Sequence, residues 1–152
     1  MESETDLKRH IEEMAKLFEM MNFNPMQGRI LAYLSTAGEM EKTFDEIVSF
    51  FGTSKSTVSN SLNYLISQKL VDYKTISGQR KRYFFLTGKL PQVYAQQQME
   101  IIRLLKEMSY KTMTLQSGNQ KELNRIIHGW IDFANRFEKM LQELIRSPEE
   151  KL

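Results

Sequence analysis

The chain has 152 residues, of which 41% are hydrophobic and 26% are charged, a balance typical of one soluble globular domain. It contains no cysteine, which excludes disulfides, zinc–thiolate sites and thiol nucleophiles. No apolar run approaches the roughly 18 residues that a membrane span needs, and the polar N-terminus is unlike a signal peptide. We therefore expect a cytoplasmic protein.

Charge is distributed unevenly, although the net charge is only +2. Residues 1–46 carry five Lys or Arg against ten Asp or Glu, whereas residues 47–99 carry seven against Asp72 alone. This basic block lies in the middle of the chain rather than in a tail. It is explained either by a solvated face or by a surface that binds a polyanion.

Two helices are predicted in the N-terminal part. The first spans residues 5–22, with Thr5 as its N-cap and an apolar stripe typical of a helix that packs on another helix. The second spans residues 26–37, with Gly38 suited to its end. The stripe of the first helix consists of Leu7, Ile11, Met14, Phe18 and Met21.

Two further helices form a helix-turn-helix pattern. Thr43 and Glu46 have the spacing of a capping box, and the helix that they open ends at Gly52. Ser54 then caps a helix that continues to about Gln68. Two short helices joined by a glycine-containing turn predict a helix-turn-helix, although many helical hairpins share this pattern.

A β-hairpin is predicted directly after this motif. Residues 71–76 (VDYKTI) and 81–87 (KRYFFLT) are rich in β-branched and aromatic side chains and flank a turn with glycine. One further short strand is expected near Thr43. A hairpin in this position is the wing of a winged helix-turn-helix.

Two long helices are predicted after the wing. One runs from about residue 91 to 115, with Pro91 in its first turn, and the other from about 120 to 146. The predicted fold class is mainly α: a three-helix core with a β-hairpin wing, flanked by N- and C-terminal helices. The apolar stripe of the last helix consists of Leu123, Ile127, Trp130, Ala134, Phe137, Leu141 and Leu144.

The second helix of the helix-turn-helix has two contrasting faces. At about 100° per residue, Val58, Leu62 and Leu65 lie on one side and small polar side chains lie opposite. Small polar residues let a backbone approach the bases of a major groove closely, and Asn can bind adenine through two hydrogen bonds. The helix N-terminus is suited to a phosphate. The predicted DNA-binding residues of this helix are Ser54, Lys55, Ser56, Thr57, Ser59, Asn60 and Asn63.

The wing offers a second predicted contact with DNA. Gln79, Arg80, Lys81 and Arg82 lie at or beside the hairpin tip, where long polar side chains can enter a minor groove or bind phosphates. The aromatic residues 83–85 are expected to anchor the hairpin to the helices rather than to stack on bases.

The motifs PMQGRILAYL, TFDEIVSFFGTSKSTVSNSLNYLISQKLVDY and GQRKRYFFLTG, with long helices at both ends, resemble the MarR family of transcriptional regulators. The amino-acid sequences of these motifs are most similar to the branch named for the glycine-betaine synthesis regulator, GbsR. The resemblance implies a sequence-specific regulator, expected to be a repressor, that binds double-stranded DNA. The short wing, with an acid-free cluster at residues 80–82, departs from the longer Asp/Arg-bearing wing of the wider family.

The resemblance also implies a homodimer on a pseudo-palindromic operator. Residues 25–88 would form the DNA-binding lobe, and residues 1–24 and 89–152 the dimerisation helices. A compact lobe would leave the apolar stripes of these helices exposed, so a two-fold partner is the simplest cover for them. The predicted interface consists of Leu7, Ile11, Met14, Phe18, Leu123, Ile127, Trp130, Phe137, Leu141 and Leu144.

Three alternatives remain open at this stage. A winged helix can bind protein instead of DNA, although the basic block disfavours this. Catalysis or a metal site is not expected, because the only histidines, His10 and His128, lack partners at motif spacing, and no cofactor is expected either. A small-molecule effector stays open, since aromatic residues could line its site; the candidates are Tyr33, Tyr94, Tyr110, Trp130 and Phe133.

Overall fold

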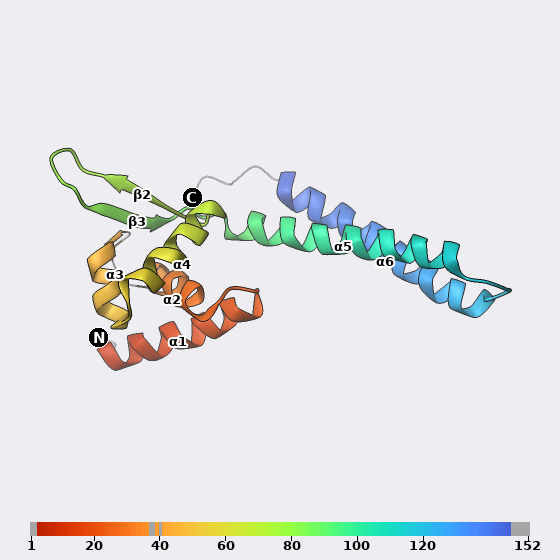
Figure 1. The fold of residues 1–152 in the computed structure, drawn as a ribbon, viewed down its shortest axis with the longest axis horizontal. Helices are drawn as coiled ribbons and strands as arrows, with labels where there is room; N and C mark the ends of the chain where they lie inside the picture. Colours follow the sequence, from red (N-terminus) through yellow and green to blue (C-terminus); the bar gives the residue numbers. More distant parts are fainter. Residues whose placement is uncertain (1–2, 37–38, 40, 147–152) are drawn as a thin grey trace. The chain divides into compact units, whose positions relative to one another are not determined.

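The computed structural model describes residues 3–36, 39 and 41–146, and it divides into two compact units, Met1–Leu90 and Pro91–Leu152 (Figure 1). Each unit is built from elements that are contiguous in the sequence. The elements are α1 (Glu4–Met20), α2 (Pro25–Thr36), β1 (Lys42–Thr43), α3 (Phe44–Phe51), α4 (Lys55–Ser67), β2 (Val71–Thr75), β3 (Arg82–Leu86), α5 (Leu90–Leu115) and α6 (Lys121–Arg146).

Helices α1 and α2 pack closely because Gly28 lies at their contact. A Cβ atom on Gly28 would come within 2.8 Å of the carbonyl oxygen of Ala15, so no larger residue fits without movement of the backbone. The predicted N-cap at Thr5 is wrong: Ser3 caps α1 and forms a capping box with Asp6. Ser3 supplies the same hydroxyl chemistry two residues earlier. The predicted helix stop at Gly38 lies outside the described residues.

The helix-turn-helix is confirmed at α3 and α4. Thr43 and Glu46 form the predicted capping box, with the Thr43 hydroxyl donating to Glu46 Oε2 over 2.7 Å. Gly52 ends α3 in the left-handed conformation at φ 58°, which glycine adopts without the strain that a Cβ would add. The capping residues therefore set where each helix of the motif starts and stops.

The wing is the β2–β3 hairpin, and it belongs to a three-stranded antiparallel sheet of order β1-β3-β2. Strand β1 pairs Thr43 with Tyr83 and Lys42 with Phe84. Because Thr43 is also the cap of α3, the wing and the helix-turn-helix share a residue. Phe84 is buried at 4% exposure, as predicted for a side chain that anchors the hairpin.

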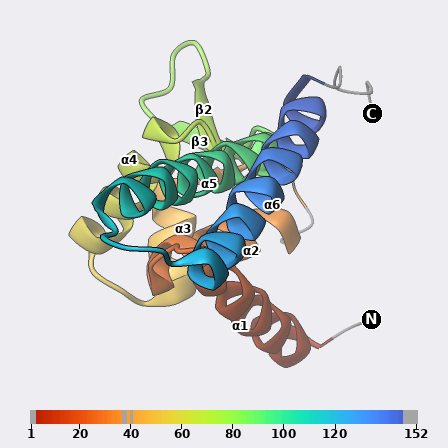
Figure 2. The same cartoon turned by 90° about the vertical axis from the view of Figure 1, so that its right-hand side faces the viewer.

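The second unit is a helical hairpin in which α5 and α6 run in opposite directions (Figures 1 and 2). A buried cluster of Ala95, Met99 and Leu141 joins the two helices, and Phe137 packs partly against it. Glu138 on α6 accepts from both Arg103 and Lys106 on α5, over 2.9 and 2.5 Å. The mainly helical fold with a small antiparallel sheet and flanking helices is thus confirmed.

Candidate nucleic-acid interface

The N-terminus of α4 gathers three hydroxyl groups. The Ser54 hydroxyl accepts the backbone N–H of Thr57 over 3.2 Å and lies 2.7 Å from the Thr57 hydroxyl and 3.1 Å from that of Ser56. The first turn of α4 contains no acidic residue. Hydroxyls and free N–H groups at a positive helix end, without a competing carboxylate, suit a phosphate oxygen.

The two faces of α4 are arranged as the sequence predicts. Val58, Leu62 and Leu65 are buried in the first unit and hold the helix in place. The face opposite them is free, and the helix side nearest the wing carries the half-buried Ser59. The predicted residues that are exposed on α4 and at its cap are Ser54, Lys55, Ser56, Thr57, Asn60 and Asn63.

Tyr64 is a residue of this face that the sequence analysis missed. It follows Asn60 by one helical turn and is 37% exposed. Its spacing from Asn60 was the available signal. A phenol beside Asn60 adds a donor and an apolar ring to the exposed face.

The wing tip is a tight turn with a glycine in a required position. The Gln79 N–H donates to the Ile76 carbonyl over 2.9 Å, and Gly78 has φ 82°, which disfavours any side chain there. Residues 72–82 are all exposed. The predicted contact residues Gln79, Arg80 and Lys81 therefore lie on the exposed turn of the hairpin, and Arg82 is the exposed first residue of β3.

Two tyrosines orient the wing side chains. The hydroxyl of Tyr83 donates to Gln79 Oε1 over 2.7 Å, and the Arg82 guanidinium lies 4.6 Å from the ring centroid of Tyr73. The sequence analysis assigned residues 83–85 to the core, yet Tyr83 is only half-buried and its hydroxyl faces the tip. The contact joins Tyr83 in the turn-proximal part of β3 to Gln79 in the turn before it, and it depends on how the turn folds back on the strand.

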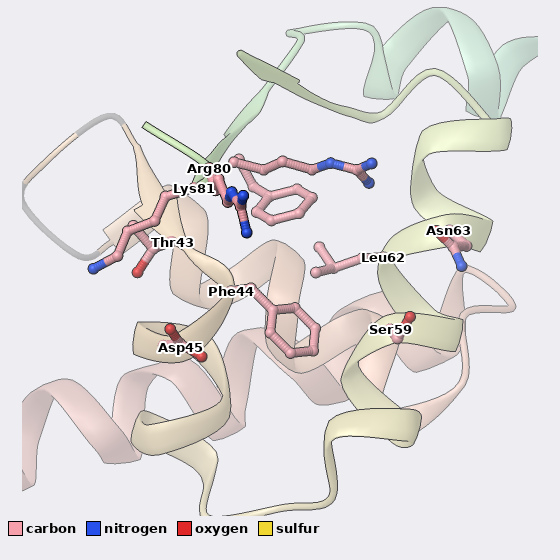
Figure 3. Close-up of a pocket in the computed structure, with 10 residues that line it drawn as sticks. Thr43, Phe44, Asp45, Ser59, Leu62, Asn63, Arg80 and Lys81 are labelled. Carbon is pink, nitrogen blue, oxygen red and sulfur yellow. The ribbon is translucent and has the colours of Figure 1, made fainter. Parts of the chain in front are cut away.

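A hollow of about 280 Å³ lies between α4 and the wing (Figure 3). Phe44 and Leu62 lie side by side in it, with Ser59 and Asn63 toward one side and Asp45 and Lys81 toward the other (Figure 3). The structure thus brings the two predicted contact groups, helix and wing, to one continuous surface. The lining residues are Thr43, Phe44, Asp45, Ser59, Leu62, Asn63, Arg80, Lys81, Arg82 and Phe84.

The positive charges of this surface are available to a ligand. In the described part of the chain, Lys55, Arg80 and Lys81 form no ion pair with an acidic residue. The nearby Glu46 forms hydrogen bonds with Thr43: bonds from its side chain and then its backbone lower the pKa of the Glu46 carboxyl below the ordinary value, with smaller contributions from the charges of Lys42 and Lys81. Unpaired cations around an exposed polar helix attract a polyanion.

The ten predicted interface residues divide between the interior and the surface. Ile11 and Phe18 are buried in the first unit, and Ile127 and Leu141 are buried in the second, so these four are used within the chain. The exposed residues of α6 form a separate row that the sequence analysis merged with the buried one. Predicted residues that are exposed or half-buried are Leu7, Met14, Leu123, Trp130, Phe137 and Leu144.

The aromatic effector candidates occupy different surroundings. Tyr33 is buried and stacks on Phe50 at a centroid distance of 4.2 Å, and burial raises the pKa of its phenol. Phe133 is exposed and stacks on Phe137 at 5.7 Å. Tyr33 therefore serves as a core residue in the first unit. Among the described residues, no three or more His, Asp or Glu side chains come together in a group that could hold a metal ion.

Comparisons with known proteins place the fold. Residues 21–82, from the end of α1 to the start of β3, match the model of the MarR family. A crystal structure described as a transcriptional regulator aligns with a TM-score of 0.65 at 16% identity, over 92% of this chain and 95% of that one. Residues 21–82 thus match the MarR family model, and the chain shares its fold with a solved transcriptional regulator.

Two further solved structures are similar at lower scores. A MepR mutant from a multidrug-resistant S. aureus clinical isolate aligns at 21% identity with a TM-score of 0.45, over 95% of this chain and 99% of that chain. A MarR family regulator from Neisseria meningitidis aligns at 22% identity with a TM-score of 0.43, over 92% and 94%. No curated protein matches the chain. Among the described residues, no helix combines the length and apolarity of a membrane span.

Proposed function

We propose that this protein is a sequence-specific transcriptional regulator that binds double-stranded DNA as a homodimer and represses the genes next to its operator. The observation that carries the proposal is the single surface formed by the exposed face of α4 and the unpaired cations of the wing. A cytoplasmic location follows from this proposed activity. We also propose that the protein is related to the GbsR branch, which the amino-acid sequence of residues 25–88 supports.

Helix and wing have different roles in this proposal. Helix α4 enters the major groove, where Asn60 and Asn63 contact base edges and so determine sequence preference. The wing cations contact the backbone or the minor groove and add affinity that depends little on sequence. The hydroxyls around Ser54 bind a phosphate at the groove edge.

Substitutions separate the two roles. Asn60→Ala should cost about 1–3 kcal/mol against the preferred sequence and less against others, because a base contact is lost. Arg80→Ala should weaken binding to all sequences evenly. The measurement is a titration against a duplex selected by the wild-type protein from a random pool, beside a scrambled duplex. An even loss for both variants would show that α4 is not the sequence reader.

A homodimer accounts for the exposed apolar row on the second unit. Trp130, Phe133 and Leu144 are 52%, 56% and 59% exposed, on a strip of α6 that flanks its buried row. A contiguous apolar strip of this kind on a soluble protein is typical of an interface. A two-fold partner covers it with the same strip, and two-fold symmetry predicts half-sites about one DNA turn, roughly 34 Å, apart.

The dimer is tested by a charge placed on this row. Trp130→Glu should yield a particle of 17.9 kDa by light scattering, where the wild type gives twice that mass, and should abolish specific binding. Phe137 is unsuitable for this test because it packs against the hairpin core. Asn135→Glu, on the exposed polar side of α6, is the matched control and should remain dimeric. Tight specific binding by a wild-type monomer would refute the dimer.

A further inference from the structure

Asp45 is the only acidic residue among those that line the hollow between α4 and the wing. It lies in the first turn of α3 and is exposed. Three cations, Arg80, Lys81 and Arg82, line the same hollow. A carboxylate on a surface otherwise suited to a polyanion opposes that ligand, so its presence needs an explanation.

The carboxylate of Asp45 is not used in a hydrogen bond or ion pair that holds the described part of the fold together. Its neighbour Glu46 forms the capping box with Thr43, whereas Asp45 makes no hydrogen bond or ion pair with any described residue. A general attraction to the N-terminus of α3 is its one evident structural contribution. That attraction does not require a second acid at this position, since Glu46 occupies the same helix turn.

The strand backbone of a bound duplex would pass beside this hollow. A helix in one groove and a wing in the next lie on either side of the phosphates that separate the two grooves. The lining fits such a segment, because Phe44 and Leu62 offer an apolar floor for a deoxyribose while Arg80 and Arg82 offer cations for its phosphates. Asp45 lines the same hollow and would repel those phosphates, because charges closer than a Debye length, about 8–10 Å, are only partly screened.

We infer that Asp45 is an affinity-limiting residue, which lowers the affinity of the protein for every duplex by repelling the phosphates beside the hollow. The inference rests on the proposed DNA-binding function. Phosphate contacts supply sequence-independent affinity, and a charge that opposes them reduces this component without touching base recognition. Because specificity is a difference between affinities, a repulsion that acts equally on all sequences weakens binding to each of them and leaves the preference between them unchanged.

The test compares Asp45→Asn with Glu13→Gln, an exposed α1 acid outside the hollow whose loss changes the net charge equally. Asp45→Asn should bind a scrambled duplex about two- to fivefold more tightly per protomer, as expected for unit charges separated by the width of the hollow near water. Its salt dependence should steepen by up to about 0.9 in log–log slope per protomer. The selected duplex should gain by the same factor, so the preference for it over the scrambled duplex should stay unchanged, and Glu13→Gln should match the wild type.

Asp45→Glu keeps the charge and should behave as the wild type, while circular dichroism and thermal melting show that each variant folds. Equal effects of Asp45→Asn and Glu13→Gln would show that the tighter binding comes from the change in net charge rather than from the position of Asp45, and would overturn the inference. Unchanged or weaker binding by Asp45→Asn would overturn it as well, and in both cases the wild type would still bind DNA. Loss of the proposed function itself would appear differently, as a wild type without salt-dependent binding to any duplex.

Discussion

Replacement of Thr43 by alanine should destabilise the first unit through a single hydroxyl. This hydroxyl accepts the Glu46 N–H over 3.3 Å and donates to Glu46 Oε2 over 2.7 Å. The backbone N–H of Thr43 also donates to Glu46 Oε2, over 2.7 Å, and this bond survives the substitution. Because only part of the box is lost, we expect a cost of about 1 kcal/mol, in the middle of the range for N-cap replacements.

The expected loss is large enough to measure by thermal or urea unfolding. For a unit of the size of Met1–Leu90, about 1 kcal/mol lowers Tm by roughly 4–8 °C. Thr43→Ser keeps the hydroxyl and is the control, with most of the stability retained. Because Thr43 also pairs with Tyr83 of the wing, Thr43→Ala should loosen the wing base, visible as faster amide exchange in β3.

The pH dependence gives a second check on the same box. Hydrogen bonds from Thr43 hold the pKa of Glu46 below its ordinary value in the folded protein. This contribution to stability is therefore complete above the unfolded pKa, and it is lost as the pH falls through the folded pKa. The difference between Thr43→Ala and the wild type should shrink below about pH 4. A variant as stable as the wild type at pH 7, or a difference that grows in acid, would refute the capping argument.

Three further substitutions, the first with a control, test a helix contact, a backbone conformation and an ion pair. Gly28→Ala should cost roughly 1–3 kcal/mol in urea unfolding, because the new Cβ meets the Ala15 carbonyl at 2.8 Å. The control Gly129→Ala has open space around its Cβ and should gain up to about 1 kcal/mol, and equal effects of the two variants would contradict the close contact of α1 with α2. Lys69→Gly should stabilise the first unit by about 1 kcal/mol, because Lys69 has φ 60° at the end of α4; a loss would show that its side chain matters more than its backbone. Glu138→Gln should lower the melting temperature at neutral pH and lose this effect in acid, because Lys106 and Arg103 lower the pKa of Glu138; a pH-independent effect would contradict it.

The features that the sequence predicted well are those that depend on neighbouring residues. The Thr43 box and the Ser54 cap follow from a hydroxyl at a fixed distance from its acceptor or donor, and the wing follows from β-rich runs around Gly78. The exposed face of α4 follows from helical periodicity alone. At the start of α1, several hydroxyl residues compete, so periodicity could not distinguish Ser3 from Thr5 as the cap.

Features that depend on contacts between distant segments could not be predicted. The apolar stripe of α1 predicted packing on another helix, but it did not identify α2 as the helix that buries Ile11 and Phe18 through the close contact at Gly28. The hollow required the start of α3 to lie beside a strand that follows it by some forty residues, so Phe44 and Asp45 were not recognised as part of the site. Such contacts leave no periodic signal in the sequence.

The central claim is that the surface formed by α4 and the wing binds double-stranded DNA. The most direct measurement is the equilibrium constant for a labelled duplex by fluorescence anisotropy over a series of salt concentrations. If each protomer neutralises about three to five phosphates, the dimer should give a slope of roughly −5 to −9 in log K against log salt, at about 0.9 per phosphate. A nearly flat slope, or binding that is unchanged when Arg80 and Lys81 are both replaced by alanine, would contradict the account.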